Sequence, residues 1–215
     1  DPVTGVLSGT PTAGDAGMVT VNLRYEEPGM PQNFDTATVS LEVVTGLFFD
    51  TFESGCSTWT LTGDWACGAP TSGPGSALGG TNVIATNLAG DYAVGVNAGT
   101  ATATSGTIDL TAATAPLLSF SVWQQWEGST SDGFYVEVST DGGTTFTLLT
   151  AVTPAYNLSL SGQPAWGDLT LVGWTAYTAD LSAFVGQSIS LRFQYESDGS
   201  DQFPGSYIDD VLVSD

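Results

Sequence analysis

The sequence contains no histidine and no lysine, and its only cationic side chains are those of Arg24 and Arg192. Ser-His-Asp and Cys-His catalysis need an imidazole as general base, and the common zinc sites use imidazole as a ligand, so the sequence excludes these classes. A pair of carboxylates of the glycosidase type is still chemically available, but no spacing in the chain identifies one. We therefore expect that the protein is not an enzyme.

The shortage of positive charge also limits the partners. Two cationic residues are set against 23 Asp and Glu residues, which gives a formal net charge of -21 and a pI near 4.1. Such a surface repels phosphate backbones and anionic lipid headgroups, so we expect neither nucleic acid nor an anionic membrane as a partner. No apolar run approaches the ~20 residues of a membrane-spanning helix, and no signal-like segment opens the chain, so the sequence predicts a mature fragment without membrane insertion.

Cysteine is scarce as well, because Cys56 and Cys67 are the only two in the chain. Without histidine to complete a zinc site, the pair is predicted to form a local disulfide that closes a hairpin. A disulfide indicates an oxidising compartment, so we expect an extracellular protein, either secreted or at the cell surface.

No long segment shows hydrophobic residues at the 3.6-residue spacing of a helix together with capping residues at its ends. Residues 181–185 could form one helical turn at most. Short alternating segments separated by Gly, Asp, Ser and Pro turns predict an all-β sandwich from residue 46 to residue 215. A hydrophobic content of 41% is sufficient for a packed core. The expected strands of this domain are 47–52, 59–61, 64–66, 92–97, 105–110, 117–123, 134–139, 145–149, 173–177, 188–195 and 207–213.

Residues 1–45 are expected to form a small module of their own, with strands over 18–25 and 37–44. The stretch TGVLSGTPT followed by an alternating strand resembles the second half of the immunoglobulin-like or cadherin-like repeats of bacterial surface proteins. The first half of such a repeat is missing, and two or three strands alone are marginal in water. We expect this piece either to pack on the main domain or to complete its sheet with residues from an excised region or from a neighbouring molecule.

The closing strand contains two adjacent carboxylates, Asp209 and Asp210, in an apolar run. Alternation sends their side chains to opposite faces, so one of them points toward a core. An unpaired buried carboxylate is costly, and with so few cationic side chains a bound cation is the expected partner. Calcium takes oxygen ligands of this kind. In the alternative interpretation, both carboxylates reach solvent at the end of the strand.

Several stretches together resemble the MAM-like jelly-roll domains that accompany immune inhibitor A type and bacillopeptidase F type secreted peptidases and many bacterial surface proteins. These stretches include TGDWACGAPTSGP, GTNVIATNLAGDYAV, LSFSVWQQWE and GSYIDDVLV, and the similarity covers about residues 47–215. The resemblance implies a jelly-roll sandwich with structural calcium and no catalytic group.

The same resemblance suggests ligands for the calcium ion. The motif positions implied are Glu53, after Phe52, together with Asp209 and Asp210. Asp91 stands where such domains carry an Asp before a strand, and Asp50 is added because it lies close to Glu53 in sequence. Alternatively, Asp91 caps a turn and Glu53 is an exposed strand residue.

A hairpin tip at residues 139–146 resembles the Asp box of sialidase propellers, with its Ser139, Asp141 and Phe146 spacing. The Asp-Gly-Gly sequence supplies the positive φ that this turn needs, so we expect a structural role only.

Tryptophan suggests one further site. Trp59, Trp65 and Trp123 are expected in the core, whereas Trp126 and Trp166 are the best candidates for exposed rings that stack on a sugar.

The sequence thus favours a noncatalytic, calcium-stabilised extracellular domain for adhesion or accessory binding in a larger secreted or surface protein. Its partners would be a cell-surface or extracellular protein, a glycan, or copies of itself. Two alternatives remain: a self-assembling fibre or surface-layer subunit that uses strand donation by the N-terminal segment, and a carbohydrate-binding module.

Overall fold

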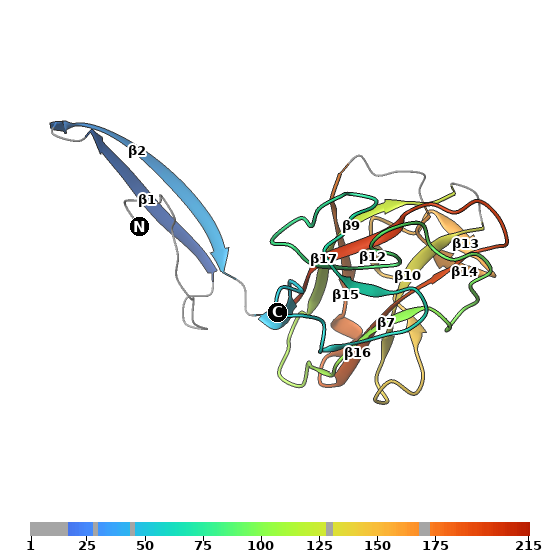
Figure 1. The fold of residues 1–215 in the computed structure, drawn as a ribbon. Helices are drawn as coiled ribbons and strands as arrows, with labels where there is room; N and C mark the ends of the chain where they lie inside the picture. Colours follow the sequence, from blue (N-terminus) through green and yellow to red (C-terminus); the bar gives the residue numbers. More distant parts are fainter. Residues whose placement is uncertain (1–16, 28–29, 44–45, 128–130, 168–172) are drawn as a thin grey trace. The chain divides into compact units, whose positions relative to one another are not determined.

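The computed structural model describes residues 17–27, 30–43, 46–127, 131–167 and 173–215. The chain divides into two compact units, Asp1–Thr45 and Gly46–Asp215. The described residues are all-β except for one short 3₁₀ helix, η2 (Ser182–Phe184), which lies where the sequence predicted a single helical turn (Figure 1). None of the described segments is a helix with the length and apolar character needed to cross a bilayer.

The first unit contains one antiparallel pair of long strands, β1 (Gly17–Glu27) and β2 (Met30–Val43). Val21 is paired with Val39 and Leu23 with Ala37, so these four side chains share one face of the ribbon. Leu23 is 43% exposed and Val39 is 39% exposed. In the described part of this unit, no third strand joins the pair. The likeness to half of an immunoglobulin or cadherin repeat stays a prediction.

The second unit is a jelly-roll sandwich of two antiparallel sheets, which confirms the fold predicted from the strand pattern. One sheet has the order β11-β10-β16-β7-β4, with β8 on β16. The other has the order β12-β15-β9-β17-β6-β5, with β3 on β17, and β13 and β14 form a separate hairpin. The strands are β3 (Gly46–Asp50), β4 (Trp59–Leu61), β5 (Ala66–Gly68), β6 (Val83–Ala85), β7 (Thr102–Ser105), β8 (Ile108–Asp109), β9 (Leu117–Gln125), β10 (Gly133–Ser139), β11 (Thr147–Leu148), β12 (Val152–Thr153), β13 (Leu158–Leu160), β14 (Gln163–Ala165), β15 (Thr175–Asp180), β16 (Ser188–Glu196) and β17 (Gly205–Ser214).

The core lies between the two sheets. Alternation along β9 sends Leu118, Phe120 and Val122 inward, where all three are buried. The ring of Phe120 lies 5.0 Å from that of Phe193 on β16 of the opposite sheet, and Trp59 stacks on Phe193 at 5.8 Å. Aromatic contacts of this kind hold the inner faces of a sandwich together. The expected core positions of Trp59 and Trp65 are confirmed.

The first and last strands of this unit lie side by side. β3 pairs antiparallel with β17, and Phe49 stands opposite Leu212. The two ends of the unit are therefore joined within one sheet, as the jelly-roll resemblance implied.

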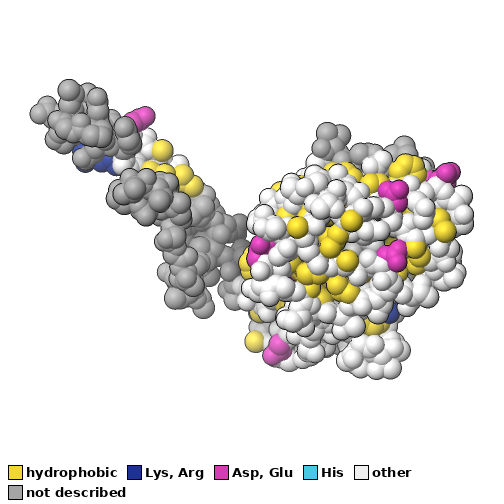
Figure 2. Space-filling model, viewed as in Figure 1, with side chains coloured by type: hydrophobic (Ala, Val, Ile, Leu, Met, Phe, Trp, Pro, Cys, Tyr) yellow, Lys and Arg dark blue, Asp and Glu magenta, His cyan; other side chains and the backbone are white. Residues whose placement is uncertain are grey.

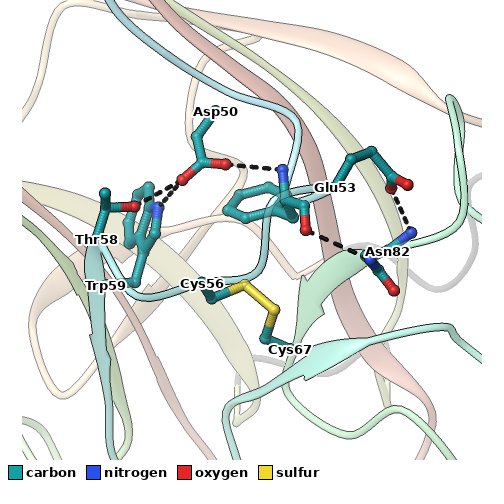
Figure 3. Close-up of a disulfide and its surroundings, with 8 residues drawn as sticks. Asp50, Glu53, Cys56, Thr58, Trp59, Cys67 and Asn82 are labelled. Carbon is teal, nitrogen blue, oxygen red and sulfur yellow. Dashed lines mark hydrogen bonds between the residues drawn. A yellow bond between two sulfur atoms is a disulfide. The ribbon is translucent and has the colours of Figure 1, made fainter.

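The predicted disulfide between Cys56 and Cys67 is present (Figure 3). The predicted hairpin around it is wrong, because β4 pairs with β7 in one sheet while β5 pairs with β6 in the other. Between the two strands the chain passes through the core at Trp65, which is buried and donates its Nε1 hydrogen to the carbonyl of Ala101. The disulfide thus connects the segment before β4 to the opposite sheet.

The strand expected over 92–97 is also absent. Tyr92 is buried, but the segment that it begins runs outside the sheets, with the Tyr92 amide donating to the Phe203 carbonyl. The chain instead forms β6, whose three residues are all buried. A strand buried on both faces has no alternation to reveal it in sequence.

Candidate metal centre

Glu53 and Asp209 meet at one loop, residues 78–82. Asp209 Oδ2 accepts hydrogen bonds from the amides of Leu78 (3.0 Å) and Gly79 (3.2 Å). Glu53 Oε1 accepts hydrogen bonds from the amides of Thr81 (2.8 Å) and Asn82 (2.6 Å), and the side chain points toward this segment in Figure 3. The structure therefore brings two of the predicted ligands to the same short stretch of backbone.

The two carboxyl groups differ in environment. Asp209 is fully buried, and burial raises its pKa although three amides, including that of Asp210, donate to it. Glu53 is exposed, and the amides of Asn82 and Thr81 lower its pKa. Backbone N–H groups thus supply part of the compensation that the sequence analysis assigned to a cation. The roles of Glu53, Asp209 and Asp210 as ligands stay a prediction.

The predicted alternation of Asp209 and Asp210 is wrong. Asp209 pairs with Ser121, and Leu212 pairs with Ser119. Asp210 and Val211 of β17 therefore both lie opposite the single Phe120 of β9. This β-bulge holds Asp210 at a φ of 50°, a left-handed conformation that is uncommon for a residue other than glycine. Asp210 consequently lines the same outer face of the sheet as Ser119 and Ser121.

The remaining predicted ligands have protein partners or lie elsewhere. Asp50 Oδ1 accepts from the Phe52 amide, and Oδ2 accepts from Thr58 Oγ1 and Trp59 Nε1 at 2.7 to 2.9 Å (Figure 3). Asp91 is exposed, and no hydrogen bond among the described residues joins its carboxylate to the 78–82 loop. The turn before it is closed by Asn87, whose side chain bonds the Ala89 amide and the Asp91 carbonyl.

A different acidic group, which the sequence analysis missed, forms the tightest carboxylate cluster. Glu127 follows β9, Asp132 precedes β10 and Asp198 follows β16, and one oxygen of each lies within 4.8 Å of the others. No other group of three metal-ligating side chains this close occurs in the described part of the chain. The three residues come from two connections far apart in sequence, so spacing could not reveal them. The available signal was an acidic residue at each end of the connection between the strands predicted at 117–123 and 134–139.

Asp132 is the buried member of this cluster. Its side chain has no exposed surface; Oδ2 accepts a hydrogen bond from the Tyr92 hydroxyl at 2.5 Å and Oδ1 accepts one from the Asp198 amide at 2.7 Å. Burial raises the pKa of Asp132, whereas the Ser200 amide and the Ser131 hydroxyl lower the pKa of Asp198. Burial also raises the pKa of Tyr92, so its hydroxyl stays a donor.

Three carboxylates this close repel one another unless a proton or a cation lies among them. They offer only hard oxygen ligands, the kind that calcium and magnesium prefer and that zinc sites seldom consist of alone. The cluster can therefore hold a divalent metal ion.

The two tryptophans expected on the surface are buried instead. Trp126 has no exposed surface and its ring lies 4.7 Å from that of Tyr92. Trp166 is 1% exposed, donates its Nε1 hydrogen to the Pro154 carbonyl and lies 4.3 Å from the Tyr156 ring. Trp126 continues the inward period of β9, which the sequence already shows. The prediction that these rings stack on a sugar is wrong, because no sugar face can reach them.

The chain is similar to a known domain family and to part of one peptidase. The family described as immune inhibitor A-like, MAM domain matches residues 89–214. Bacillopeptidase F of Bacillus subtilis is 32% identical over 181 residues, which is 83% of this chain and 11% of that protein. The chain therefore spans about a tenth of the length of this relative.

Solved structures with a similar fold have lower identity. The K3 cleaved adhesin domain of Lys-gingipain from Porphyromonas gingivalis is 17% identical with a TM-score of 0.46, over 80% of this chain and 100% of that one. A family 22 carbohydrate-binding module of Clostridium thermocellum Xyn10B is 12% identical with a TM-score of 0.47, over 81% of this chain and 96% of that one.

Proposed function

Because the chain belongs to the immune inhibitor A-like MAM domain family, we propose that it is a noncatalytic, calcium-stabilised binding domain of a larger extracellular protein. The coverage of 11% of bacillopeptidase F supports an accessory part within a longer polypeptide. The disulfide between Cys56 and Cys67 supports an oxidising, extracellular location. The sequence without histidine or lysine supports a role that involves no acid-base catalysis by those side chains.

The observation that carries the proposal is the burial of Asp132 within its carboxylate cluster. Asp132 is fully buried and held by Tyr92 and Asp198, so an ion bound there would connect the segments after β9, before β10 and after β16. Such an ion would have a structural role, since its ligand lies inside the protein. Calcium accepts irregular sets of carboxylate and carbonyl oxygens, which suits residues drawn from two separate connections.

Calorimetry tests the calcium proposal directly. We expect the metal-free chain to take up calcium with measurable heat, and the melting temperature to be higher in calcium than in chelator. Mass action predicts a gain of about 2.7 kcal/mol at a calcium concentration 100 times the Kd. An unchanged melting curve in excess chelator, starting from a calcium-replete sample, would contradict the proposal.

Two matched substitutions assign the ion. Asp132→Asn removes a charge from the cluster of Glu127, Asp132 and Asp198, here named the Glu127 cluster. Asp209→Asn removes a charge from the pair of carboxylates that accept hydrogen bonds from the 78–82 loop. If the Glu127 cluster is the site, only Asp132→Asn abolishes the heat of binding. If only Asp209→Asn abolishes it, the ligands predicted from the sequence hold the ion. A stoichiometry of two that falls to one in each variant indicates that both are occupied.

The noncatalytic part needs its own measurement. We expect no turnover when the calcium-replete chain is incubated with labelled casein or with soluble xylan and glucan. Product that forms in proportion to protein concentration, and that is lost on heat denaturation, would show an enzyme instead.

The β1–β2 ribbon supports a second candidate function, self-assembly through added strands. Its two strands present Val21, Leu23, Ala37 and Val39 on one face, and the described residues provide no third strand. Unpaired strand edges are templates for pairing with another chain. Light scattering coupled to size exclusion tests this, with mass expected to rise with concentration and Leu23→Lys to prevent the rise. A constant monomer mass would exclude assembly.

A further inference from the structure

A groove lies on the outer face of the seven-stranded sheet. It has a volume of about 330 Å³ and is lined by residues of β3, β9, β15 and β17, namely Phe49, Ser119, Phe120, Ser121, Ala176, Asp210 and Leu212. Phe49 is 62% exposed, the largest exposed fraction among the bulky apolar side chains of the described residues. A ring so exposed on a sheet face loses the burial that usually stabilises an aromatic side chain.

The polar groups of the groove are available for a ligand. Within the described part of the chain, the hydroxyls of Ser119 and Ser121 and the carboxylate of Asp210 make no hydrogen bond. Asp210 is brought to this face by the β-bulge of β17 and keeps its φ of 50° there. Bulges that redirect a side chain, and strained residues other than glycine, concentrate at binding sites.

The charge of the groove restricts the ligand. Asp210 is its only charged lining residue, and Arg192, the only cationic residue of the second unit, is paired with Glu137 at 2.7 Å. An anionic ligand would meet a carboxylate with no cation to balance it. In the view of Figure 2, the acidic side chains on the second unit stand singly among neutral polar and apolar surface.

The combination of apolar, hydroxyl and carboxylate groups in the groove favours a neutral ligand over a cationic one. An ammonium group only donates, so it would use Asp210 but leave the donor capacity of the two serine hydroxyls unused. A sugar ring presents an apolar C–H face to an aromatic ring and hydroxyls that both donate and accept. Phe49, the two serines and Asp210 match that combination, and the small side chain of Ala176 leaves the floor of the groove open.

We propose that this groove binds a neutral saccharide, with the Phe49 ring against the sugar face and Ser119, Ser121 and Asp210 bonded to its hydroxyls. The inference rests on the proposed function as a binding domain and names its ligand class. It differs from the sugar site predicted at Trp126 and Trp166, both of which lie inside the protein.

Binding of the full chain to arrayed oligosaccharides tests the inference, in calcium-containing buffer. The array carries neutral xylo-, gluco-, manno- and chito-oligosaccharides, anionic galacturonic acid and heparin fragments, and lysine-rich peptides beside extracellular matrix proteins. We expect binding to a neutral oligosaccharide. Calorimetry with that oligosaccharide should show Phe49→Ala weakened about tenfold or more, because removal of a central aromatic anchor commonly costs this much.

Two further variants make the test specific. Ala176→Leu fills the groove with an exposed residue and should abolish binding while the melting temperature stays unchanged. Val185→Ala removes another exposed apolar side chain, 40% exposed, outside the groove and should leave the affinity unchanged. Neither Phe49 nor Ala176 belongs to an acidic cluster, so the calcium response of both variants should match that of the parent chain.

The outcomes separate the two proposals. Neutral oligosaccharide binding that is unaffected by both Phe49→Ala and Ala176→Leu would show that the groove is not the binding site. Binding only to lysine-rich peptides or to matrix proteins would contradict a saccharide ligand but not the proposed role as a binding domain. An array without any signal overturns the inference together with the binding role.

Discussion

Glu53 and Asp209 accept hydrogen bonds from the two halves of one loop, Asp209 from Leu78 and Gly79 and Glu53 from Thr81 and Asn82. Gly80 lies between the two halves at a φ of 63°, and a Cβ atom at this position would come within 2.4 Å of Glu53 Cδ. The loop is thereby tied to the segment after β3 and to β17, the first and last strands of the domain.

Gly80→Ala is therefore expected to lower the free energy of unfolding by about 1 to 3 kcal/mol, through backbone strain at positive φ and displacement of Glu53. Urea denaturation measures the change. Gly79→Ala is the matched control, because only Asp210 Oδ2, at 4.0 Å, lies near its added methyl group. Equal stabilities of the two variants would show that the Glu53 bonds do not hold the loop.

The sequence predicted the fold better than the site, for reasons visible at particular residues. Short alternating strands and turn residues are local signals, so β9, β10 and β16 were placed nearly correctly. Trp126 continues the inward alternation of β9, so the sequence of this strand already predicts its burial. The site depends on contacts distant in sequence, such as Tyr92 with Asp132 and Asp132 with Asp198, which no spacing encodes.

The bulge at Asp210 shows a second limit. A single extra residue in β17 shifts the alternation by one position, so that the side chains of Asp209 and Asp210 both lie on the outer face of the sheet. Neither residue type nor hydrophobic period marks that position, because Asp is tolerated in strand ends, turns and bulges alike. The outcome is set by pairing with β9, whose register the sequence of β17 does not contain.

Stability should depend on pH through Asp141, at the tip of the hairpin between β10 and β11. Hydrogen bonds from the Thr145 side chain and amide, and from Ser139, lower the pKa of Asp141 to about 2. A carboxyl whose folded pKa lies below its unfolded value of about 3.9 stabilises the fold above that value. This stabilisation is lost as the pH falls from about 4 toward 2.

We expect Asp141→Asn to lower the melting temperature at pH 6 and to have much less effect near pH 2, where the parent carboxyl is about half protonated in the folded chain and almost fully protonated in the unfolded chain. Melting curves in chelator across this range measure the difference. Asp35→Asn in the first unit is the control, since among the described residues the Asp35 side chain bonds only the neighbouring Thr36 amide. A deficit of the same size at both pH values would show that the charge of Asp141 contributes nothing.

Burial raises the pKa values of Asp132 and Asp209, which is opposite in direction to the shift at Asp141. Their folded pKa values are raised, so each contributes stability below its unfolded pKa that is lost as the pH rises through the folded pKa. In chelator, the parent chain should therefore melt at a higher temperature at pH 5 than at pH 7. Calcium should reduce this difference, because a cation stabilises the ionised carboxylates. A pH 5 to pH 7 difference that calcium leaves unchanged would contradict this account.

Removal of the disulfide should destabilise the second unit. The bond spans 11 residues in sequence, for which loop closure predicts a contribution of about 3 kcal/mol. Urea denaturation of a Cys56→Ser, Cys67→Ser double variant should show a loss of this size, and reductant should affect the parent chain but not the variant. Parent midpoints that are identical with and without reductant, with free thiols confirmed by mass, would exclude a stabilising role.

The hydroxyl of Tyr92 offers the most direct test of the acidic cluster. It donates to Asp132 Oδ2, and both residues are fully buried, so Tyr92→Phe removes one of the two donors to this carboxylate among the described residues. Loss of a hydrogen bond to a buried charged group costs about 1 to 3 kcal/mol, and we expect that deficit in chelator. In saturating calcium the deficit should shrink, since a bound cation compensates the same carboxylate.

Tyr195→Phe is the matched control. Tyr195 packs 6.0 Å from the Tyr92 ring, but its hydroxyl lies 3.4 Å from Asp64 Oδ2, which is too far for a strong hydrogen bond. Equal deficits in the two variants, unchanged by calcium, would show that the hydroxyl of Tyr92 does not stabilise Asp132 and that no cation acts at this cluster.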